Sequence, residues 1–319
     1  MFSNVQKALA VSAVAVSLAG SAAHAQTAYP HKVVTLVTHS SPGSGSDVFL
    51  RHITKYLGPI MGVNFIVDNI TGGGGAKAMA ALAQAPADGS IFYATTPTYI
   101  FTSLLSEPEY KWSDLDPLVN VFIDEEVLFT AASSPFQTLE DVMESARADR
   151  GKWGASTPGS LERQAMERLK AASGVEAAIV THEGGGEMTI NVLNGTLDMG
   201  VGEFAELRPQ IDGGMVRILA VFSSERLAGA PDVPTVKELG YDVVVQKFRG
   251  LAGPKGQPPE VIAAWEEGIQ KVLADPTYMA EYGAELLSPA YKSHADTVEF
   301  TATFAAETEE FFRSTGVIE

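Results

Sequence analysis

The sequence predicts an α/β protein of two lobes, each built on a mostly parallel sheet flanked by helices. Three observations lead to this prediction. Short apolar segments alternate with stretches of helical periodicity along most of the 319 residues. Turns rich in Gly and Ser follow several apolar segments, and they occur in both halves of the chain. Repeated strand, helix, strand order gives a parallel sheet with right-handed crossovers.

The first half of the chain contains three strand-and-turn units. Residues 33–57 read as an apolar strand, a small-residue loop and an amphipathic helix, which Gly58-Pro59 is expected to end. A strand at 63–67 leads through a run of four glycines into an Ala-rich helix at 76–85. Residues 91–95 read as the third strand.

The middle of the chain leads into a second series of units. Residues 110–117 read as a loop, and 119–123 with 127–132 as strand interrupted by three acidic residues. A helix at 138–148 follows. Small-residue turns then occur at 154–160, 181–186 and 201–203. Further helices are expected from 161, at 187–193, 204–211, 258–274 and 297–313, and further strands at 216–222 and 243–245.

The order of the units places the lobes along the chain. Lobe 1 is expected to comprise 26–128 and 251–319, and lobe 2 to comprise 129–250. The chain would cross between lobes near 127–132 and 248–253, giving a hinge, and the last helix would return to the first lobe. Ligands of open α/β sheets bind at the carboxyl ends of the strands, so two facing lobes would form a clamp.

The N-terminus has the features of a secretory signal peptide. Lys7 precedes an apolar run at 8–19, and Ala23-His24-Ala25 is an A-x-A cleavage site. The run is too short to span a bilayer. We therefore expect residues 1–25 to be removed near Ala25 and the protein to be periplasmic. The chain has no Cys, which excludes disulfides, thiolate metal sites and a cysteine nucleophile.

Net charge limits the partners. The formal net charge of −17 makes nucleic acids and anionic membrane surfaces unfavourable partners. A bound anion would have to be held by local dipoles.

Two glycine-rich loops, at 40–47 and 72–75, each connect a strand to a helix. Their small side chains let a ligand approach the first N–H groups of the helix, an arrangement that binds anions. The alternative is two tight turns with good helix caps, and Asp47 is expected to act as such a cap. Neither loop has the frame of a P-loop or a complete G-x-G-x-x-G, so phosphate chemistry is not indicated.

Ten short motifs, taken in order and spacing, resemble one family. They lie at 29–30, 42–47, 69–75, 86–89, 184–186, 194–198, 216–221, 231–235, 250–254 and 258–260. Over essentially all of the chain after the leader, the sequence is similar to the periplasmic solute-binding proteins of tripartite tricarboxylate transporters, the Bug or TctC family.

The resemblance implies a two-lobed periplasmic-binding-protein clamp of type II-like architecture, often called a Venus flytrap. It implies a small carboxylate ligand, a di- or tricarboxylate or an aromatic acid, passed to a membrane permease. No cofactor, no metal and no catalysis are expected, and we expect a monomer. The implied ligand-binding residues are Ser41, Gly43, Ser44, Gly45, Ser46, Thr71, Gly72, Gly73, Gly74, Gly75, Ser156, Thr157, Gly159, His182, Gly184 and Gly185.

The sequence departs from the family pattern at four places. Ser44 stands where the first loop usually has a glycine, Thr71 stands for Pro, Ala76 for Asn, and His182-Glu183 for a Tyr-Lys pair. These departures leave the identity of the ligand open.

Several charged residues have two interpretations. Arg249 either binds the ligand carboxylate or pairs with Asp124, Glu125 or Glu126, and we favour the ion pair. His182 and His39 are either donors to a carboxylate or ordinary histidines. A zinc site at His182-Glu183 lacks the second His that H-E-x-x-H requires. Glu203 and Glu206 would repel a dianion, so we expect them to cap a helix or to bind an amine, a hydroxyl or a water.

Other functions are less well supported. A secreted hydrolase would need Ser44 or Ser46 as nucleophile, but neither lies in a G-x-S-x-G frame. An exported sensory binding protein without a transport role, or a purely structural exported protein, would also carry a leader. The structural alternative does not explain the two anion-binding loops.

Overall fold

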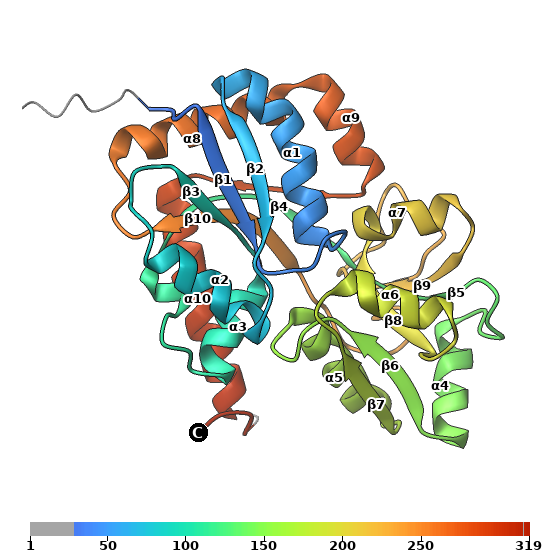
Figure 1. Cartoon of the computed structure of the whole chain (residues 1–319). Helices are drawn as coiled ribbons and strands as arrows, with labels where there is room; N and C mark the ends of the chain where they lie inside the picture. The colour runs from blue at the N-terminus through green and yellow to red at the C-terminus, as the bar shows by residue number, and fades with distance from the viewer. Residues whose placement is uncertain (1–28, 315) are drawn as a thin grey trace, which may run out of the picture.

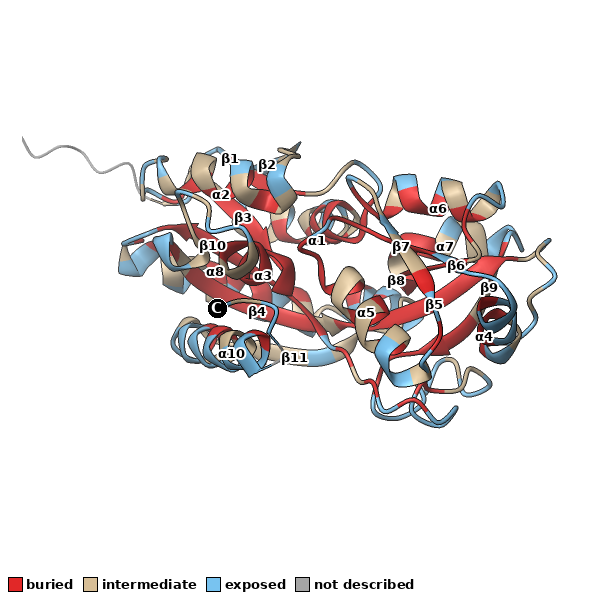
Figure 2. Ribbon diagram, turned by 90° about the horizontal axis from the view of Figure 1, so that it is seen from below, coloured by how far each residue is buried: buried red, intermediate tan, exposed pale blue. Residues whose placement is uncertain are grey.

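Two mixed sheets, one in each lobe, organise the chain (Figure 1). The computed structural model describes residues 29–314 and 316–319, so the expected signal peptide lies outside the described residues. The two-lobed α/β class is confirmed. In both lobes the buried strands lie between helices whose outer faces are exposed (Figure 2).

The first lobe holds a six-stranded sheet of order β11-β4-β10-β3-β1-β2. Its strands are β1 (Val33–Thr38), β2 (Asn64–Asn69), β3 (Ile91–Thr95), β4 (Leu115–Asp124), β10 (Lys247–Pro254) and β11 (Ser288–Lys292). Its helices are α1 (Gly45–Met61), η1 (Gly73–Gly75), α2 (Ala76–Ala83), α3 (Pro97–Leu105), η2 (Trp112–Asp114), α8 (Pro259–Ala274), α9 (Pro276–Ala284) and α10 (His294–Ser314).

The second lobe holds a five-stranded sheet of order β7-β6-β8-β5-β9. Its strands are β5 (Glu126–Ala131), β6 (Gly151–Ala155), β7 (Ala177–Thr181), β8 (Met199–Glu203) and β9 (Val216–Val221). Its helices are α4 (Leu139–Ala148), α5 (Leu161–Ser173), α6 (Gly185–Leu193) and α7 (Phe204–Asp212).

Each sheet is mixed rather than mostly parallel. Strand β1 pairs in parallel with β2 and β3, and β6 with β7 and β8. Strand β10 is antiparallel to β3 and β4, and β5 is antiparallel to β8 and β9. The difference arises where the lobes connect. Strand β4 leaves the first lobe while β10 returns to it, so these two neighbours run in opposite directions.

The chain crosses between the sheets at two places. Glu125 alone separates β4 from β5, and the segment between β9 and β10 carries the chain back. The lobe boundaries expected from the sequence, at 128/129 and 250/251, lie a few residues later in the chain than these crossings.

Some expected element boundaries were wrong. Helix α1 does not end at Gly58-Pro59 but continues to Met61, where Gly62 caps it in a left-handed conformation (φ 68°) and donates to Gly58 O. Pro59 removes one backbone N–H, but because it lies in the last turn the helix continues past it. Residues 243–245 form no strand, although Val245 N–H donates to Phe222 O at 3.0 Å. Residues 115–117 of the expected loop belong to β4.

The last helix packs against the first lobe, as expected. Helix α10 lies along β4, and the ring of Phe312 is 5.6 Å from that of Phe101 in α3. Within the described part of the chain, no helix combines the length and apolar character needed to cross a membrane.

Trp265 of α8 anchors the core of the first lobe. It is fully buried, with its ring centroid 4.6 Å from Phe92 and 5.8 Å from Phe65. We expect Trp265→Ala to lower the free energy of unfolding by about 3–5 kcal/mol, because it leaves a large cavity. Urea unfolding measures this change, and a loss below about 1 kcal/mol would show that the site collapses around the smaller residue.

Candidate functional site

A small polar cavity lies where the two lobes meet. The parallel strands β1 and β3 of one lobe, and β6 and β8 of the other, end beside it. About 20 Å³ of space is open, roughly the room of one water molecule. The lining residues are His39, Ser40, Ser44, Gly45, Ser46, Thr96, Thr98, Ser156, Thr157, Glu162, Gly184, Gly185, Glu203, Glu206, Lys247 and Arg249.

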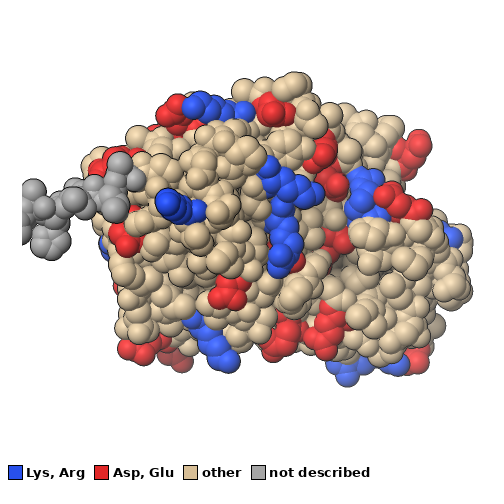
Figure 3. Space-filling view, turned by 45° about the horizontal axis from the view of Figure 1, so that its top comes forward, with Lys and Arg blue, Asp and Glu red and all other residues tan. Residues whose placement is uncertain are grey.

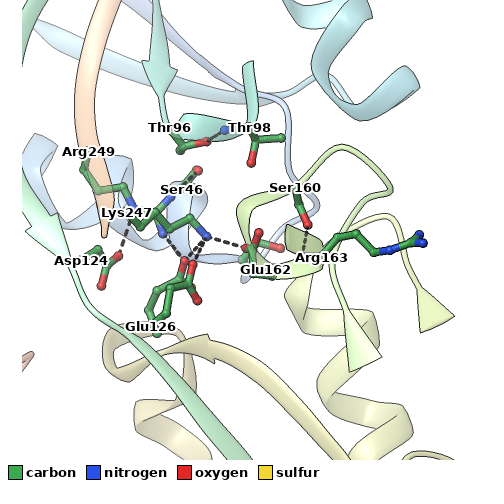
Figure 4. Close-up of polar contacts among 12 residues, drawn as sticks. Ser46, Thr96, Thr98, Asp124, Glu126, Ser160, Glu162, Arg163, Lys247 and Arg249 are labelled. Carbon is green, nitrogen blue, oxygen red and sulfur yellow. Dashed lines mark hydrogen bonds and ion pairs between the residues drawn. The ribbon is translucent and has the colours of Figure 1, made fainter. Parts of the chain in front are cut away.

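Helix N-termini from both lobes reach this cavity. Helix α1 begins at Gly45 and α6 at Gly185, and the first N–H groups of a helix have no acceptor within it. Helix α3 follows Thr96, whose Oγ1 accepts from Thr98 N–H at 3.2 Å. Figure 4 shows this Thr pair above the buried charges and Glu162, at the start of α5, beside the Lys247 ammonium. The partial positive charge of these helix ends favours an anion.

Glycines leave room for neighbouring side chains at the junction of the lobes. A Cβ on Gly184 would lie 2.4 Å from Ser41 Oγ and 2.6 Å from Ser44 Oγ, across the cleft. A Cβ on Gly45 would lie 2.2 Å from Arg249 Nη2 and 2.6 Å from Glu203 Oε2. Larger side chains at these positions are incompatible with the closed arrangement.

Arg249 joins the two lobes through three hydrogen bonds. Its guanidinium donates to Asp124 Oδ2 (2.9 Å), to Ser46 Oγ (2.8 Å) and to Glu203 Oε1 (2.7 Å). Two of these contacts are drawn in Figure 4. The favoured ion pair with Asp124 is confirmed, and Glu203 of the second lobe is an additional partner. The side chain is 1% exposed.

Lys247 lies two residues earlier on the same strand. Its ammonium forms ion pairs with Glu126 (3.2 Å), Glu162 (2.5 Å) and Glu203. These three carboxylates form the one group of metal-ligating side chains found in the described residues, and the ammonium lies among them. Lys247 therefore occupies the position that a cation would take.

The buried carboxyl groups around Lys247 and Arg249 fall into two sets, one with raised and one with lowered pKa values. Burial raises the pKa of Glu126 well above its usual range, and burial together with Glu203 does the same to Glu206. Burial, only partly offset by Arg249, raises the pKa of Asp124 to about 7. Burial opposes ionisation of Glu162 and Glu203 too, but the charge of Lys247 together with hydrogen bonds, and for Glu203 also the charge of Arg249, outweighs it and lowers both pKa values.

His39 brings no charge to the cavity at neutral pH. Burial and the nearby Lys247 lower its pKa to about 4, and its Nδ1 lies 2.6 Å from Tyr93 Oη. The expectation that Asp47 caps the helix was wrong, because Ser44 is the N-cap residue of α1 and makes no side-chain cap bond. Asp47 lies in the first turn and has a structural role instead, since its carboxylate accepts from Gly43 N–H at 2.9 Å and pairs with Arg51.

The structure brings together about half of the residues expected from the sequence. Those that line the cavity are Ser44, Gly45, Ser46, Ser156, Thr157, Gly184, Gly185 and Arg249. Those that do not line it are Ser41, Gly43, Thr71, Gly72, Gly73, Gly74, Gly75, Gly159 and His182. Ligand contact by any of these residues remains a prediction.

The residues outside the lining have other neighbours. Gly74 O accepts from Thr102 Oγ1 at 2.7 Å, so the second glycine-rich loop packs on α3. His182 Nδ1 lies 3.3 Å from Ala155 O, and its Nε2 lies 3.2 Å from Asn191 Nδ2.

Sequence reasoning missed several lining residues. They are Ser40, Thr96, Thr98, Glu162 and Lys247. The sequence could have predicted Lys247 as a lining residue, because it stands two residues before Arg249 and alternate residues of a strand share a face. The sequence could also have indicated Thr96, because Thr-Pro is a common start of a helix.

The chain matches known proteins over most of its length. Residues 49–317 match the family described as "Tripartite tricarboxylate transporter family receptor". The chain is 26% identical over 307 residues to Protein BugT of Bordetella pertussis (strain Tohama I), covering 94% of each protein.

Two solved structures resemble the fold. R. palustris Rpa4515 with adipate has a TM-score of 0.85 at 24% identity, covering 90% of this chain and 98% of that one. MatC (Rpa3494) from Rhodopseudomonas palustris with bound malate has a TM-score of 0.79 at 21% identity, covering 91% of this chain and 100% of that one.

Gly45 tests the closed arrangement. Gly45→Ala should disfavour closure by about 1–3 kcal/mol, because in the closed arrangement the new Cβ would lie 2.6 Å from Glu203 Oε2 of the second lobe, which is held by Arg249. Small-angle scattering should give a larger radius of gyration for this variant than for the wild type. Gly283→Ala is the control, since that position has open space. Identical scattering from all three proteins would contradict the prediction.

The buried carboxyl groups predict a pH dependence of stability. Glu126 and Glu206 have raised pKa values in the folded state, so above about pH 5 the folded protein binds more protons than the unfolded chain. The free energy of unfolding should therefore fall between pH 6.5 and 8.5, by at most about 1.4 kcal/mol per pH unit for each group. His39 acts in the opposite direction at the lower end of this range, because its pKa is about 4 in the folded state but about 6.5 in the unfolded chain, which is therefore partly protonated there. Above about pH 7.5 it is neutral in both states and contributes nothing. Urea unfolding should show a shallower slope for Glu206→Gln; an unchanged slope would contradict the assignment.

Proposed function

Because the chain belongs to the tripartite tricarboxylate transporter receptor family, we propose that it is a periplasmic solute-binding receptor. It captures a small organic carboxylate between its lobes and delivers the ligand to the permease of such a transporter. The observation that carries this proposal is the convergence of helix N-termini from both lobes on one cavity. Backbone N–H groups and hydroxyls there can hold a carboxylate without a dedicated counter-ion.

The relatives support the ligand class. The solved structures with adipate and malate have this fold, and both compounds are small carboxylates. The leader expected at residues 1–25, with cleavage near Ala25, would deliver the protein to the periplasm. The formal net charge of −17 suits a soluble carrier that avoids nucleic acid and anionic lipid. On the face drawn in Figure 3, acidic and basic side chains are interspersed among uncharged ones.

The cavity requires the lobes to open before a ligand enters. Its open space of about 20 Å³ is too small for a dicarboxylate. The two crossings, at Glu125 and in the segment before Lys247, are the places where backbone rotation would separate the lobes. We infer that the closed form is the one in which both lobes contact the ligand.

Binding rather than hydrolysis fits the two serines. Ser44 Oγ lies 3.1 Å from Ser41 Oγ, and Ser46 Oγ accepts from Arg249. In the part of the chain that the structure describes, neither hydroxyl hydrogen-bonds a histidine that could act as a base. An esterase assay with the exported protein should therefore show no turnover.

Thermal melting against a ligand panel tests the proposal. The exported protein is melted with mono-, di- and tricarboxylates, with aromatic acids, and with sugars and uncharged amides as controls. An acid present at a hundred times its dissociation constant should stabilise the protein by about 2.7 kcal/mol, and the neutral controls should have no effect. An unchanged melting temperature with every acid of the panel would overturn the proposal.

Thr157 provides a sharper test within the cavity. Its side chain is 6% exposed, and its Oγ1 has no hydrogen-bond partner among the described residues. If the hydroxyl binds the ligand, Thr157→Val should weaken binding about 5- to 13-fold without destabilising the free protein, because a neutral hydrogen bond contributes about 1–1.5 kcal/mol. Calorimetry with the best acid of the panel measures this.

Thr189→Val is the matched control for this experiment. Thr189 has an equally buried, unpartnered hydroxyl but does not line the cavity. Equal affinities for the wild type and both variants would remove Thr157 from the binding site.

A further inference from the structure

The buried cluster at the junction of the lobes contains more acids than bases. Among the described residues, five carboxyl groups, from Asp124, Glu126, Glu162, Glu203 and Glu206, share two cations, Lys247 and Arg249. His39 adds no charge at neutral pH. Buried charges are stable only when they are paired. The closed cluster therefore needs either extra protons or another cation.

Both cations of the cluster are already engaged. Lys247 pairs with Glu126, Glu162 and Glu203, and Arg249 pairs with Asp124 and Glu203. Within the described residues Glu206 has no ion-pair partner, and it is hydrogen-bonded to Glu203. A hydrogen bond between two carboxyl groups requires a proton on one of them.

Three residues that line the cavity have carboxylate oxygens without hydrogen-bond partners. Glu162 Oε2, Glu203 Oε2 and Glu206 Oε1 have no hydrogen-bond partner in the described part of the chain. All three residues line the cavity and are more than nine-tenths buried. Gly185 makes the room for Glu206, since a Cβ there would lie 2.0 Å from Glu206 Oε1. Unsatisfied buried acceptors are costly, so a donor from the ligand would be strongly favoured.

We propose that the ligand carries a protonated amine as well as a carboxylate, and that Glu206, together with Glu203, binds the ammonium group. This inference rests on the proposed function, which supplies the carboxylate end of the ligand. An ammonium has three N–H donors and one positive charge. It would replace the proton shared by Glu203 and Glu206 and would satisfy their unpartnered oxygens, while the helix N-termini of α1 and α6 hold the carboxylate.

Other occupants fit the carboxylates less well. A ligand with carboxylates at both ends would bring a second negative charge against Glu203 and Glu206, and like charges in a buried site repel strongly. A metal ion would compete with the Lys247 ammonium, which already lies among Glu126, Glu162 and Glu203.

Matched pairs of acids test the inference on the wild-type protein. Each pair differs only by an amino group: 4-aminobutyrate with butyrate, glutamate with glutarate, and aspartate with succinate. Dissociation constants for the exported protein are measured by calorimetry at pH 7.5, with Ca²⁺ and Mg²⁺ alone as further arms. The amino member should bind at least tenfold more tightly in every pair that binds, since a charged hydrogen bond contributes about 1.5–3 kcal/mol.

Variants assign the preference to Glu206. Glu206→Gln keeps the size of the side chain but removes the charge, so the ratio within a pair should fall to about twofold or less. Glu206→Asp should retain part of the preference for the amino member of each pair. This variant tests the assignment if Glu206→Gln does not fold. Glu187→Gln is the control, because this exposed carboxylate of the same lobe accepts from Glu183 N–H outside the cavity.

The outcomes separate the two proposals. Amine-free acids that bind as tightly as their amino partners would overturn this inference and leave the proposed function standing. Stabilisation by Ca²⁺ or Mg²⁺ alone would also overturn it, by assigning the carboxylates to a metal. If neither member of any pair binds, and the wider acid panel is also silent, the proposed function fails and this inference fails with it.

Discussion

Buried ion pairs between the lobes are the constraint on which the closed structure depends. Lys247 and Arg249 belong to the sheet of the first lobe, but Glu126, Glu162 and Glu203 belong to the second. Removing one partner of such a pair typically costs about 3–5 kcal/mol, because the other charge stays buried and unpaired. Opening the cleft lets water reach these groups, so the balance between open and closed forms depends on charge and protonation. A ligand that changes that balance changes the conformation.

Much of the fold was predictable because its signals are local. The strand, small-residue turn and helix of β1 and α1 lie within 29 residues, and their periodicities change at the turn. Helices α3 and α9 were missed although Thr96-Pro97 and Asp275-Pro276 are helix-start signals. Strand β11 was also missed, since an edge strand with a register shift has a weak pattern of its own. The mixed direction of the sheets depends on how the lobes connect, which no local pattern encodes.

Part of the candidate site could likewise be predicted from local sequence, and part could not. Its Ser- and Gly-rich part could be predicted, because turns after parallel strands meet at one edge of a sheet. The turn after β2 has the same composition, but β2 is the outermost strand, and η1 packs on α3 instead of facing the cavity. The ion pairs could not be predicted, because Lys247 and Glu162 are 85 residues apart and only the tertiary fold brings them together.

The glycines of the two loops serve different physical requirements. Gly72 to Gly75 all have positive φ angles, between 61° and 119°, so the backbone conformation itself favours glycine there. Gly45, Gly184 and Gly185 have no such requirement; each instead leaves space for a neighbouring side chain. At Gly45 these are Arg249 of the same lobe and Glu203 of the other, at Gly184 they are Ser41 and Ser44 across the cleft, and at Gly185 it is Glu206 of the same lobe. The sequence interpretation assigned both loops to approach of the ligand. In the first loop and at α6, the absence of a Cβ equally allows the lobes to meet, so ligand access and closure place the same demand on these residues.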